Sequence, residues 1–142
     1  MRNVSHILER KGSLIVAVAG QAPVLEAIRL MAEYHIGAVL VMRGDELIGI
    51  ASERDYARKV ILQGRSSSDT PVATIMSSPV VCVSPQESIT DCMSIMTEKH
   101  IRHLPVLDEG RVTGIVSIGD LVKELIAEQK QEISFLQQYI AS

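Results

Sequence analysis

The sequence predicts a mixed α/β protein made of two tandem copies of one β-α-β-β-α unit, followed by a long C-terminal helix. Three observations support this prediction. Shifted by 65 residues, the segment 16–61 matches 81–126 without a gap, and 13 of the 46 pairs are identical. Within each copy, short β-type runs alternate with segments of helical periodicity. After the second copy, apolar residues continue at alternating spacings of four and three.

The composition is that of a packed globular protein and argues against two classes of partner. The chain has 142 residues, of which 46% are hydrophobic and 22% are charged, and these are ordinary values. The net charge of −3 gives no positive field for nucleic acid, and only 3% of the residues are aromatic. The longest apolar run, 14–19, is too short to span a bilayer, and the N-terminus lacks a signal-peptide core. We therefore expect a cytoplasmic protein without nucleic-acid or membrane partners.

The first copy is expected to begin with a strand over 14–19. A helix follows, and its apolar face carries Val24, Ala27, Ile28 and Met31. Buried strands over 38–42 and 47–51 then form a hairpin around the turn 43–46. The serine after the second hairpin strand is expected to open another helix.

The second copy repeats this order. Its strands are expected over 80–83, 104–107 and 112–116. Its first helix places four apolar residues on one face, namely Ile89, Cys92, Met93 and Met96. Ser88 or Ser84 is expected to cap this helix, with Pro85 tolerated in its first turn.

Polar, turn-forming residues from Gln63 to Pro71 separate the two copies. The predicted boundaries are 7–66 for the first repeat, 67–73 for the linker, 74–130 for the second repeat and 131–142 for a helical extension. A single repeat buries too little surface to be comfortably stable alone. We therefore expect the two repeats to pack face to face with pseudo-twofold symmetry and to share a core.

The last helix is expected to run from Ile118 to about Ile140, a length of roughly 34 Å. Its seam has coiled-coil spacing and consists of Val122, Ile126, Gln129, Ile133, Leu136 and Ile140. The helix could lie back on its own domain or face a partner. We favour a partner, because past the repeat the helix has little core of its own to cover. A short helix over 4–11, ended by Gly12, is expected to join the same interface.

Two equivalent segments, 49–55 and 114–120, carry the pattern Gly-Ile-x-Ser-x-x-Asp where a strand turns into a helix. Free backbone N–H groups at a helix start attract anions such as phosphate, and a carboxylate there can accept hydrogen bonds from both hydroxyls of a ribose. The alternative is a capping box, in which the serine and the aspartate satisfy backbone donors. The two roles are compatible, and two copies in register favour a binding site. The candidate residues are Ser52, Asp55, Ser117 and Asp120.

This doubled pattern, with the run 104–108 upstream of its second copy, resembles a tandem pair of CBS (cystathionine-β-synthase) domains, also called a Bateman module. The resemblance covers roughly residues 7 to 126, and the runs 52–59 and 101–106 resemble those of stand-alone bacterial members. It implies a pseudo-twofold disc with a ligand cleft on each side, and commonly a homodimer. The implied ligands are AMP, ADP, ATP, NAD or an S-adenosyl compound.

The resemblance also implies roles for the motif residues. Asp55 and Asp120 would bind ribose, and Ser52 and Ser117 would lie beside ribose or phosphate. Among the basic residues, Arg54 and Arg102 suit phosphate through the planar guanidinium fork. The other basic candidates, each of which fits an exposed helix face when taken singly, are Arg58, Lys59 and Lys123.

The two repeats differ beside the motif. The run Arg102-His103-Leu104-Pro105, whose four residues are candidate ligand contacts, stands where the first repeat has Gly37-Ala38-Val39-Leu40. Pro105 lacks an N–H, so its strand is expected at a sheet edge or beside a cleft. Because of this difference, it stays open whether both clefts bind and whether they bind the same ligand.

No constellation typical of catalysis or metal binding emerges from the spacing of reactive residues. Cys82 and Cys92 have no CxxC context, and His35 and His100 fall at matching helix ends, where capping is favoured over metal binding. We therefore expect a module that senses an adenine nucleotide and regulates a separate effector protein, with no enzymatic activity and no catalytic cofactor. The alternative is an interaction and oligomerisation module with vestigial clefts.

Overall fold

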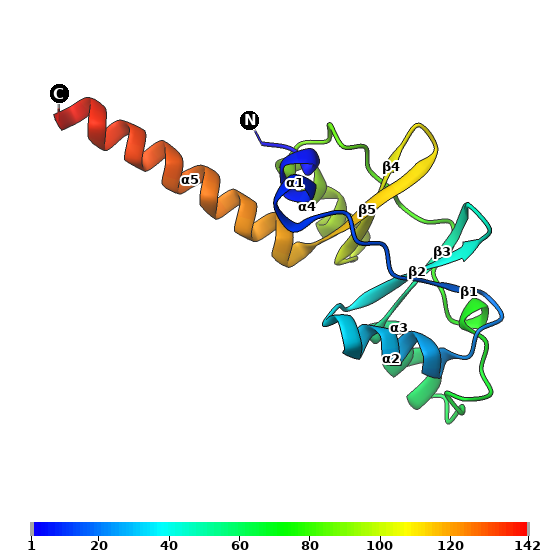
Figure 1. Cartoon of the computed structure of the whole chain (residues 1–142). Coiled ribbons are helices and arrows are strands. Elements are labelled where there is room, and N and C mark those ends of the chain that lie inside the picture. The colour runs from blue at the N-terminus through cyan, green and yellow to red at the C-terminus, as the bar shows by residue number, and fades with distance from the viewer. Residues whose placement is uncertain (1, 142) are drawn as a thin grey trace. The chain divides into compact units, whose positions relative to one another are not determined.

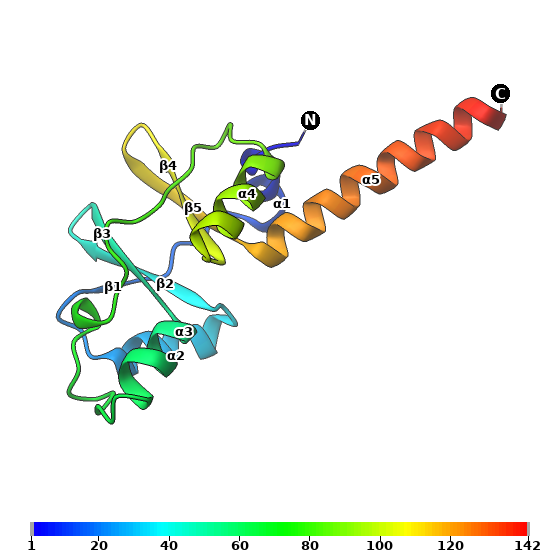
Figure 2. The ribbon, with the colours of Figure 1, turned by 180° about the vertical axis from the view of Figure 1, so that it is seen from behind.

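The computed structural model describes residues 2–141, which form two compact units (Figures 1 and 2). The first-repeat unit consists of residues 15–81. The second-repeat unit combines the N-terminal segment up to Leu14 with the chain from Cys82 onward. The N-terminal helix therefore belongs to the same unit as the second repeat.

A three-stranded sheet of order β1-β2-β3 forms the centre of the first-repeat unit. Strand β1 runs parallel to β2, and β3 pairs antiparallel on the other side. The elements are β1 (Ala17–Ala19), α2 (Val24–Tyr34), β2 (Ala38–Arg43), β3 (Glu46–Ser52) and α3 (Glu53–Tyr56), with a π-helical turn (Ala57–Ile61) and a 3-10 turn (Val72–Thr74). Helix α2 buries the face that its periodicity predicted, whereas β1 is shorter than predicted because residues 14 and 15 lie exposed.

The second-repeat unit contains a two-stranded antiparallel sheet covered by three helices. Its elements are α1 (Val4–Lys11), α4 (Ile89–Lys99), β4 (His103–Asp108), β5 (Arg111–Ser117) and α5 (Ile118–Ala141). The N-terminal helix is confirmed, and Gly12 ends it with a φ of 86°. The two hairpins have the same register, since Ala38 pairs with Ser52 as His103 pairs with Ser117, and both carry an irregularity at the same place. The sequence repeat is therefore a structural repeat, and the predicted fold class is confirmed.

The strand predicted over 80–83 is wrong, because this segment makes a single parallel bridge at Val83. In the first-repeat unit, the N–H of Leu40 donates to the carbonyl of Val16 at 3.0 Å, and β1 continues this pairing along β2. Pro105 occupies the position equivalent to Leu40 and has no N–H to donate. Strand β4 is consequently an edge of its two-stranded sheet, as Pro105 predicted.

The helix ends follow from local chemistry. The hydroxyl of Ser88 caps α4 by accepting the N–H of the third helical residue at 3.0 Å. Ser84 and Pro85 lie before the helix, so the alternative cap and the proline in the first turn are wrong. His35 and His100 both end their helices in the left-handed conformation, with φ of 54° and 55°, which confirms their matching positions.

One glycine in each hairpin allows a segment from outside the repeat to pack against it. A Cβ at Gly49 would overlap the sulfur of Met76, and a Cβ at the equivalent Gly114 would lie 2.7 Å from a methyl group of Leu8. Both positions therefore favour glycine, because a neighbouring side chain fills the space that a Cβ would need. Met76 belongs to the first-repeat unit and Leu8 to the second-repeat unit, so each hairpin is packed by a segment of its own unit that lies outside the matched segments 16–61 and 81–126.

Helix α5 is 24 residues long, close to the predicted length. Only Leu121 and Glu124 of its described residues are buried, and its C-terminal half extends away from the second-repeat unit (Figures 1 and 2). The apolar seam residues are exposed, from 38% at Val122 to 82% at Ile140. None of the helices within residues 2–141 combines the length and apolarity needed to cross a membrane.

Candidate functional site

The candidate site consists of two equivalent strand-to-helix corners, which we call corner 1 (residues 49–55) and corner 2 (residues 114–120). In corner 1, the hydroxyl of Ser52 accepts the N–H of Asp55 at 3.2 Å, and the carboxylate of Asp55 accepts the N–H of Ser52 at 2.9 Å. Together these bonds form a complete capping box at the start of α3.

Corner 2 has the same geometry at the start of α5. The hydroxyl of Ser117 accepts the N–H of Asp120 at 3.1 Å, and the carboxylate of Asp120 accepts the N–H of Ser117 at 2.8 Å. The capping role that the sequence offered as an alternative is therefore present at both corners. A cap uses part of the hydrogen-bonding capacity of each side chain, because a carboxylate has about four acceptor positions and a hydroxyl has about three in all.

The first amide of each helix is also occupied. The N–H of Glu53 donates to the carbonyl of Gly37 at 3.1 Å, and the N–H of Ile118 donates to the carbonyl of Arg102 at 2.9 Å. The amide of the second helical residue has no hydrogen-bond partner within residues 2–141. Each corner thus offers an anion one backbone donor in its first turn, where the sequence had suggested several.

A lysine pairs with the aspartate of each corner, but the two lysines come from different elements. In corner 1, Lys59 lies one turn beyond Asp55, and its Nζ is 3.1 Å from the carboxylate. In the second repeat the position equivalent to Lys59 is Glu124 of α5. At this position α5 therefore supplies no cation to pair with Asp120. Lys11 of α1 replaces it, with its Nζ 2.8 Å from Oδ2 of Asp120.

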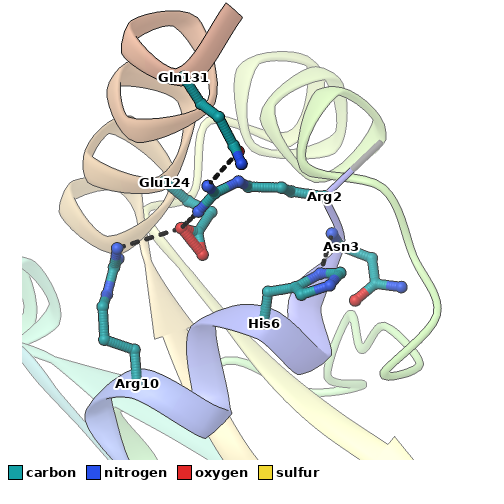
Figure 3. Close-up of polar contacts among 6 residues, drawn as sticks. All are labelled: Arg2, Asn3, His6, Arg10, Glu124 and Gln131. Carbon is teal, nitrogen blue, oxygen red and sulfur yellow. Dashed lines mark hydrogen bonds and ion pairs between the residues drawn. The ribbon is translucent and has the colours of Figure 1, made fainter. Parts of the chain in front are cut away.

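Glu124 of α5 forms ion pairs with two arginines of the N-terminal segment (Figure 3). Its side chain is 1% exposed, and its Oε2 lies 3.1 Å from a guanidinium nitrogen of both Arg2 and Arg10. Arg2 also donates to the side-chain oxygen of Gln131 at 2.7 Å, about two helical turns beyond Glu124 along α5. The buried carboxylate is therefore paired by two arginines, one just before α1 and one in its last turn, and this fixes the helix that carries Lys11.

Corner 2 collects further basic groups around His103 of β4. Burial lowers the pKa of His103; the Asp120 carboxylate opposes this effect, and the cations of Lys11 and Arg102 add to it. Burial would raise the pKa of Asp120, but hydrogen bonds from Lys11 and Ser117, together with the Lys11 charge, hold that pKa below its ordinary value. Near neutral pH, Asp120 is therefore ionised and His103 is mainly uncharged.

The predicted site residues fall into three groups in the structure. Those lying half-buried at or beside the corners are Ser52, Arg54, Asp55, His103, Ser117 and Asp120. Arg58 and Arg102 are exposed, whereas the side chains of Leu104 and Pro105 belong to the buried core and present no polar side-chain group. The structure brings Arg102, His103, Ser117 and Asp120 together in the second-repeat unit.

Lys11 was missed from the sequence, because 109 residues separate it from Asp120. One signal was available. Lys59 of the first repeat aligns with Glu124 of the second, so this charge reversal removes the expected partner of Asp120. A compensating cation from outside the repeat could have been sought on that ground.

The pKa of His103 predicts a pH dependence of stability. Because this pKa is lowered in the folded protein, the unfolded chain takes up a proton at His103 first, as the pH falls below about 6.5. The free energy of unfolding should then decrease, and His103→Gln should reduce that decrease. Urea unfolding of both proteins between about pH 7.5 and pH 5 measures the difference, since all other titrating groups are common to both. Parallel pH profiles would contradict the prediction.

The two cysteines show no sign of a reactive thiol. Burial raises the pKa of Cys92 to about 11, with the charges of Glu87 and Asp91 adding to the effect. Burial also raises the pKa of Cys82. Both thiols stay protonated near neutral pH, which makes them poor nucleophiles. Within residues 2–141, no group of three or more His, Cys, Asp or Glu side chains is placed to hold a metal ion.

Two copies of one α-β-β-α unit, each with a Ser-x-x-Asp corner and the first preceded by strand β1, define a tandem-repeat α/β module. The CBS-domain family model matches residues 13–61 and 72–127, and the chain belongs to the CBS-domain family. Among curated relatives, the mitochondrial CBS domain-containing protein CBSX3 of Arabidopsis thaliana is 39% identical over 122 residues, and the match covers 82% of this chain and 59% of that protein. The CBS domain-containing protein YhcV of Bacillus subtilis is 32% identical over 118 residues, and the match covers 83% of this chain and 84% of that protein.

Solved structures agree with this assignment. A CBS-domain protein from Burkholderia ambifaria is 52% identical with a TM-score of 0.87, covering 90% of this chain and 96% of that chain. A CBS-domain protein from Agrobacterium tumefaciens is 36% identical with a TM-score of 0.83, and the match covers 87% of this chain and 98% of that chain. A more distant CBS domain pair, 22% identical with a TM-score of 0.79, shares the fold, and the match covers 90% of this chain and 98% of that chain. That domain pair was solved in complex with 5′-methylthioadenosine and S-adenosyl-L-methionine.

Proposed function

We propose that this protein is a regulatory module that binds an adenosine-containing ligand at its strand-to-helix corners and passes the binding signal to a separate protein. The observation that carries the proposal is the duplication of one corner. Both repeats place a serine hydroxyl and an aspartate carboxylate at the same point of the fold, and a lysine pairs with each aspartate, Lys59 in corner 1 and Lys11 of α1 in corner 2. One capping box explains one corner, whereas a cation paired with each capping aspartate is more than a cap requires.

The corner chemistry suits a ribose with an attached phosphate. An ionised aspartate accepts hydrogen bonds from the two adjacent hydroxyls of a ribose, and the lysine and the free amide bind an anion. The capping bonds of Asp120 involve Oδ2, so the second carboxylate oxygen can serve a ligand without loss of the cap. AMP, ADP, ATP, NAD and S-adenosyl compounds all contain the ribose that this arrangement would recognise.

The comparisons support the proposal at the level of ligand class. The distant domain pair that shares the fold holds two adenosine derivatives. Family membership also favours a regulatory role over catalysis, so the proposal contains no reaction step. It includes a cytoplasmic location and a homodimer, for which the exposed seam of α5 provides a surface.

Isothermal titration with AMP, ATP, NAD and S-adenosylmethionine tests the proposal. Asp55→Ala and Asp120→Ala should each weaken binding at their own corner by about 10- to 150-fold, because a hydrogen bond to a charged group contributes about 1.5–3 kcal/mol. Asp108→Ala, at the exposed end of β4, is the matched control and should leave affinity unchanged. Urea unfolding of each variant separates the loss of a cap, about 1 kcal/mol, from loss of the fold.

Two results would contradict the proposal. The first is no binding of any of the four compounds by the wild-type protein in the sub-millimolar range. The second is equal affinity of the wild type and both aspartate variants, which would remove these carboxylates from the site.

A second candidate function is assembly through the C-terminal helix, with corners that bind nothing. The specific observation is the exposed seam of α5, in which Ile126, Ile133 and Leu136 are between 45% and 57% exposed. Deleting residues 131–142 separates the two functions. If ligand affinity survives while the oligomer is lost, α5 is an assembly device that is independent of ligand binding.

A further inference from the structure

We propose that Lys11 of the N-terminal helix is a specificity-determining residue of corner 2, which selects an adenosine ligand with a 5′-phosphate over uncharged adenosine. This inference rests on the proposed function and adds to it the charge of the ligand. AMP, ADP, ATP and NAD carry this phosphate, whereas adenosine and 5′-methylthioadenosine lack it. Lys11 lies before the two segments that match the family model, and no part of the Ser-x-x-Asp motif contains it.

The geometry places Lys11 beside the carboxylate of Asp120, the group that would bind the ribose. Its Nζ lies 2.8 Å from Oδ2 of Asp120, and its side chain is 35% exposed. An ammonium group has three N–H donors, of which Asp120 takes one. Within residues 2–141 the remaining donors have no partner, so they can bind an anion beside the carboxylate that would hold the ribose.

The local charge favours an anion at corner 2. Lys11 and Arg102 are cationic, Asp120 is anionic and His103 is mainly uncharged near neutral pH, so the four groups together carry about one positive charge. Without Lys11, the charges of Arg102, Asp120 and His103 would sum to about zero. Lys11 therefore supplies the positive charge that distinguishes a phosphate-bearing ligand from a neutral one.

Helix α1 holds Lys11 in this position. Val4 and Ile7 of α1 are fully buried, and Arg2 and Arg10 pair with the buried carboxylate of Glu124. The helix is therefore held by its buried residues and by ion pairs near both of its ends, and Lys11 projects from an ordered element and not from a loose terminus. A surface lysine on a solvated helix face would have no such anchoring.

The two corners are expected to differ in phosphate selection, because they differ in the basic groups around the aspartate. In corner 1, the lysine that pairs with Asp55 also donates to the carbonyl of Ile75 at 2.9 Å, so fewer of its donors are free. Positions 37 and 38, which align with Arg102 and His103, are glycine and alanine. Corner 2 is therefore the corner at which phosphate selection is expected.

Isothermal titration with AMP and with adenosine tests the inference. Both titrations are made in the Asp55→Ala background, which weakens corner 1 so that binding at corner 2 is observed. Lys11→Gln should weaken AMP binding by about tenfold or more, with adenosine binding changed by less than about twofold. Lys11→Arg should retain the preference for AMP, because it keeps the charge. Lys99→Gln, at the exposed end of α4, is the matched control and should change neither affinity.

Each outcome bears on the inference. A ratio of AMP to adenosine affinity that is unchanged by Lys11→Gln would overturn it. Tighter AMP binding by Lys11→Gln would also overturn it and would mean that Lys11 competes with the ligand for Asp120. If the Asp55→Ala protein binds neither compound and the wild type binds none of AMP, ATP, NAD and S-adenosylmethionine, the proposed function itself fails. If AMP and adenosine bind equally well before any change at Lys11, the proposed function stands and the phosphate selection fails.

Discussion

Replacing both Arg2 and Arg10 with alanine is expected to lower the free energy of unfolding by about 3 kcal/mol. Glu124 is 1% exposed, and within residues 2–141 its ion-pair partners are these two arginines. Without them, a buried carboxylate is left without a counter-charge, which typically costs about 3–5 kcal/mol. We expect the lower end of this range, because both arginines are partly exposed and solvent already screens the pairs. Urea unfolding followed by circular dichroism measures the change.

The two single substitutions provide the internal comparison. Arg2→Ala and Arg10→Ala should each cost only about 1 kcal/mol, because the other arginine still pairs with Glu124. The double variant should therefore cost more than the sum of the singles. Glu124→Leu introduced into the double variant should restore stability, because it removes the unpaired carboxylate and fills a similar volume. A double variant as stable as the wild type would contradict the assigned role of Glu124.

The element pattern could be predicted from the sequence because it follows from local periodicity and from the repeat. The apolar spacing of α2 and α4, the two hairpins and the length of α5 all depend on residues close together in the chain. The repeat added a second, independent copy of each signal. For this reason the serine at the end of β3 and of β5 could be recognised from the sequence alone as the start of a helix.

The strand over 80–83 shows where local reasoning fails. Its own residues are β-type, and the sequence shows that Pro105 lacks an N–H. What the sequence could not show is that this missing donor faces the segment 80–83, at the position where Leu40 pairs with Val16. The loss of one hydrogen bond in a neighbouring strand thus limits the pairing to a single bridge at Val83.

The corners were predictable as local motifs, but their electrostatic partners were not. Ser52 and Asp55 lie three residues apart, so a capping box can be read directly from the sequence. The partner of Asp120 is Lys11, and pairing over such a separation depends on the packing of α1 on the second repeat. This packing requires Gly114 to make room for Leu8, a contact that periodicity does not reveal.

A charge in the seam of α5 is expected to abolish the homodimer that we propose. Ile133 is 56% exposed and lies at the centre of the seam, three residues before Leu136 and four after Gln129. A second copy of α5 in antiparallel orientation would place Ile126 opposite Leu136, so the seam is complementary to itself. Gln129 provides a polar position of the kind that fixes register in such helices.

Ile133→Glu would place two carboxylates in this apolar seam, one from each copy. Like or unpaired charges in a desolvated interface cost several kcal/mol, so the dissociation constant of the dimer should rise by about 100-fold or more. Gln138→Glu is the matched control, because it adds the same charge to an exposed position of α5 outside the seam. Sedimentation equilibrium of the three proteins measures the effect. The seam has no role in assembly if Ile133→Glu and the wild type associate equally, because a solvated helix face tolerates a carboxylate and a desolvated one does not.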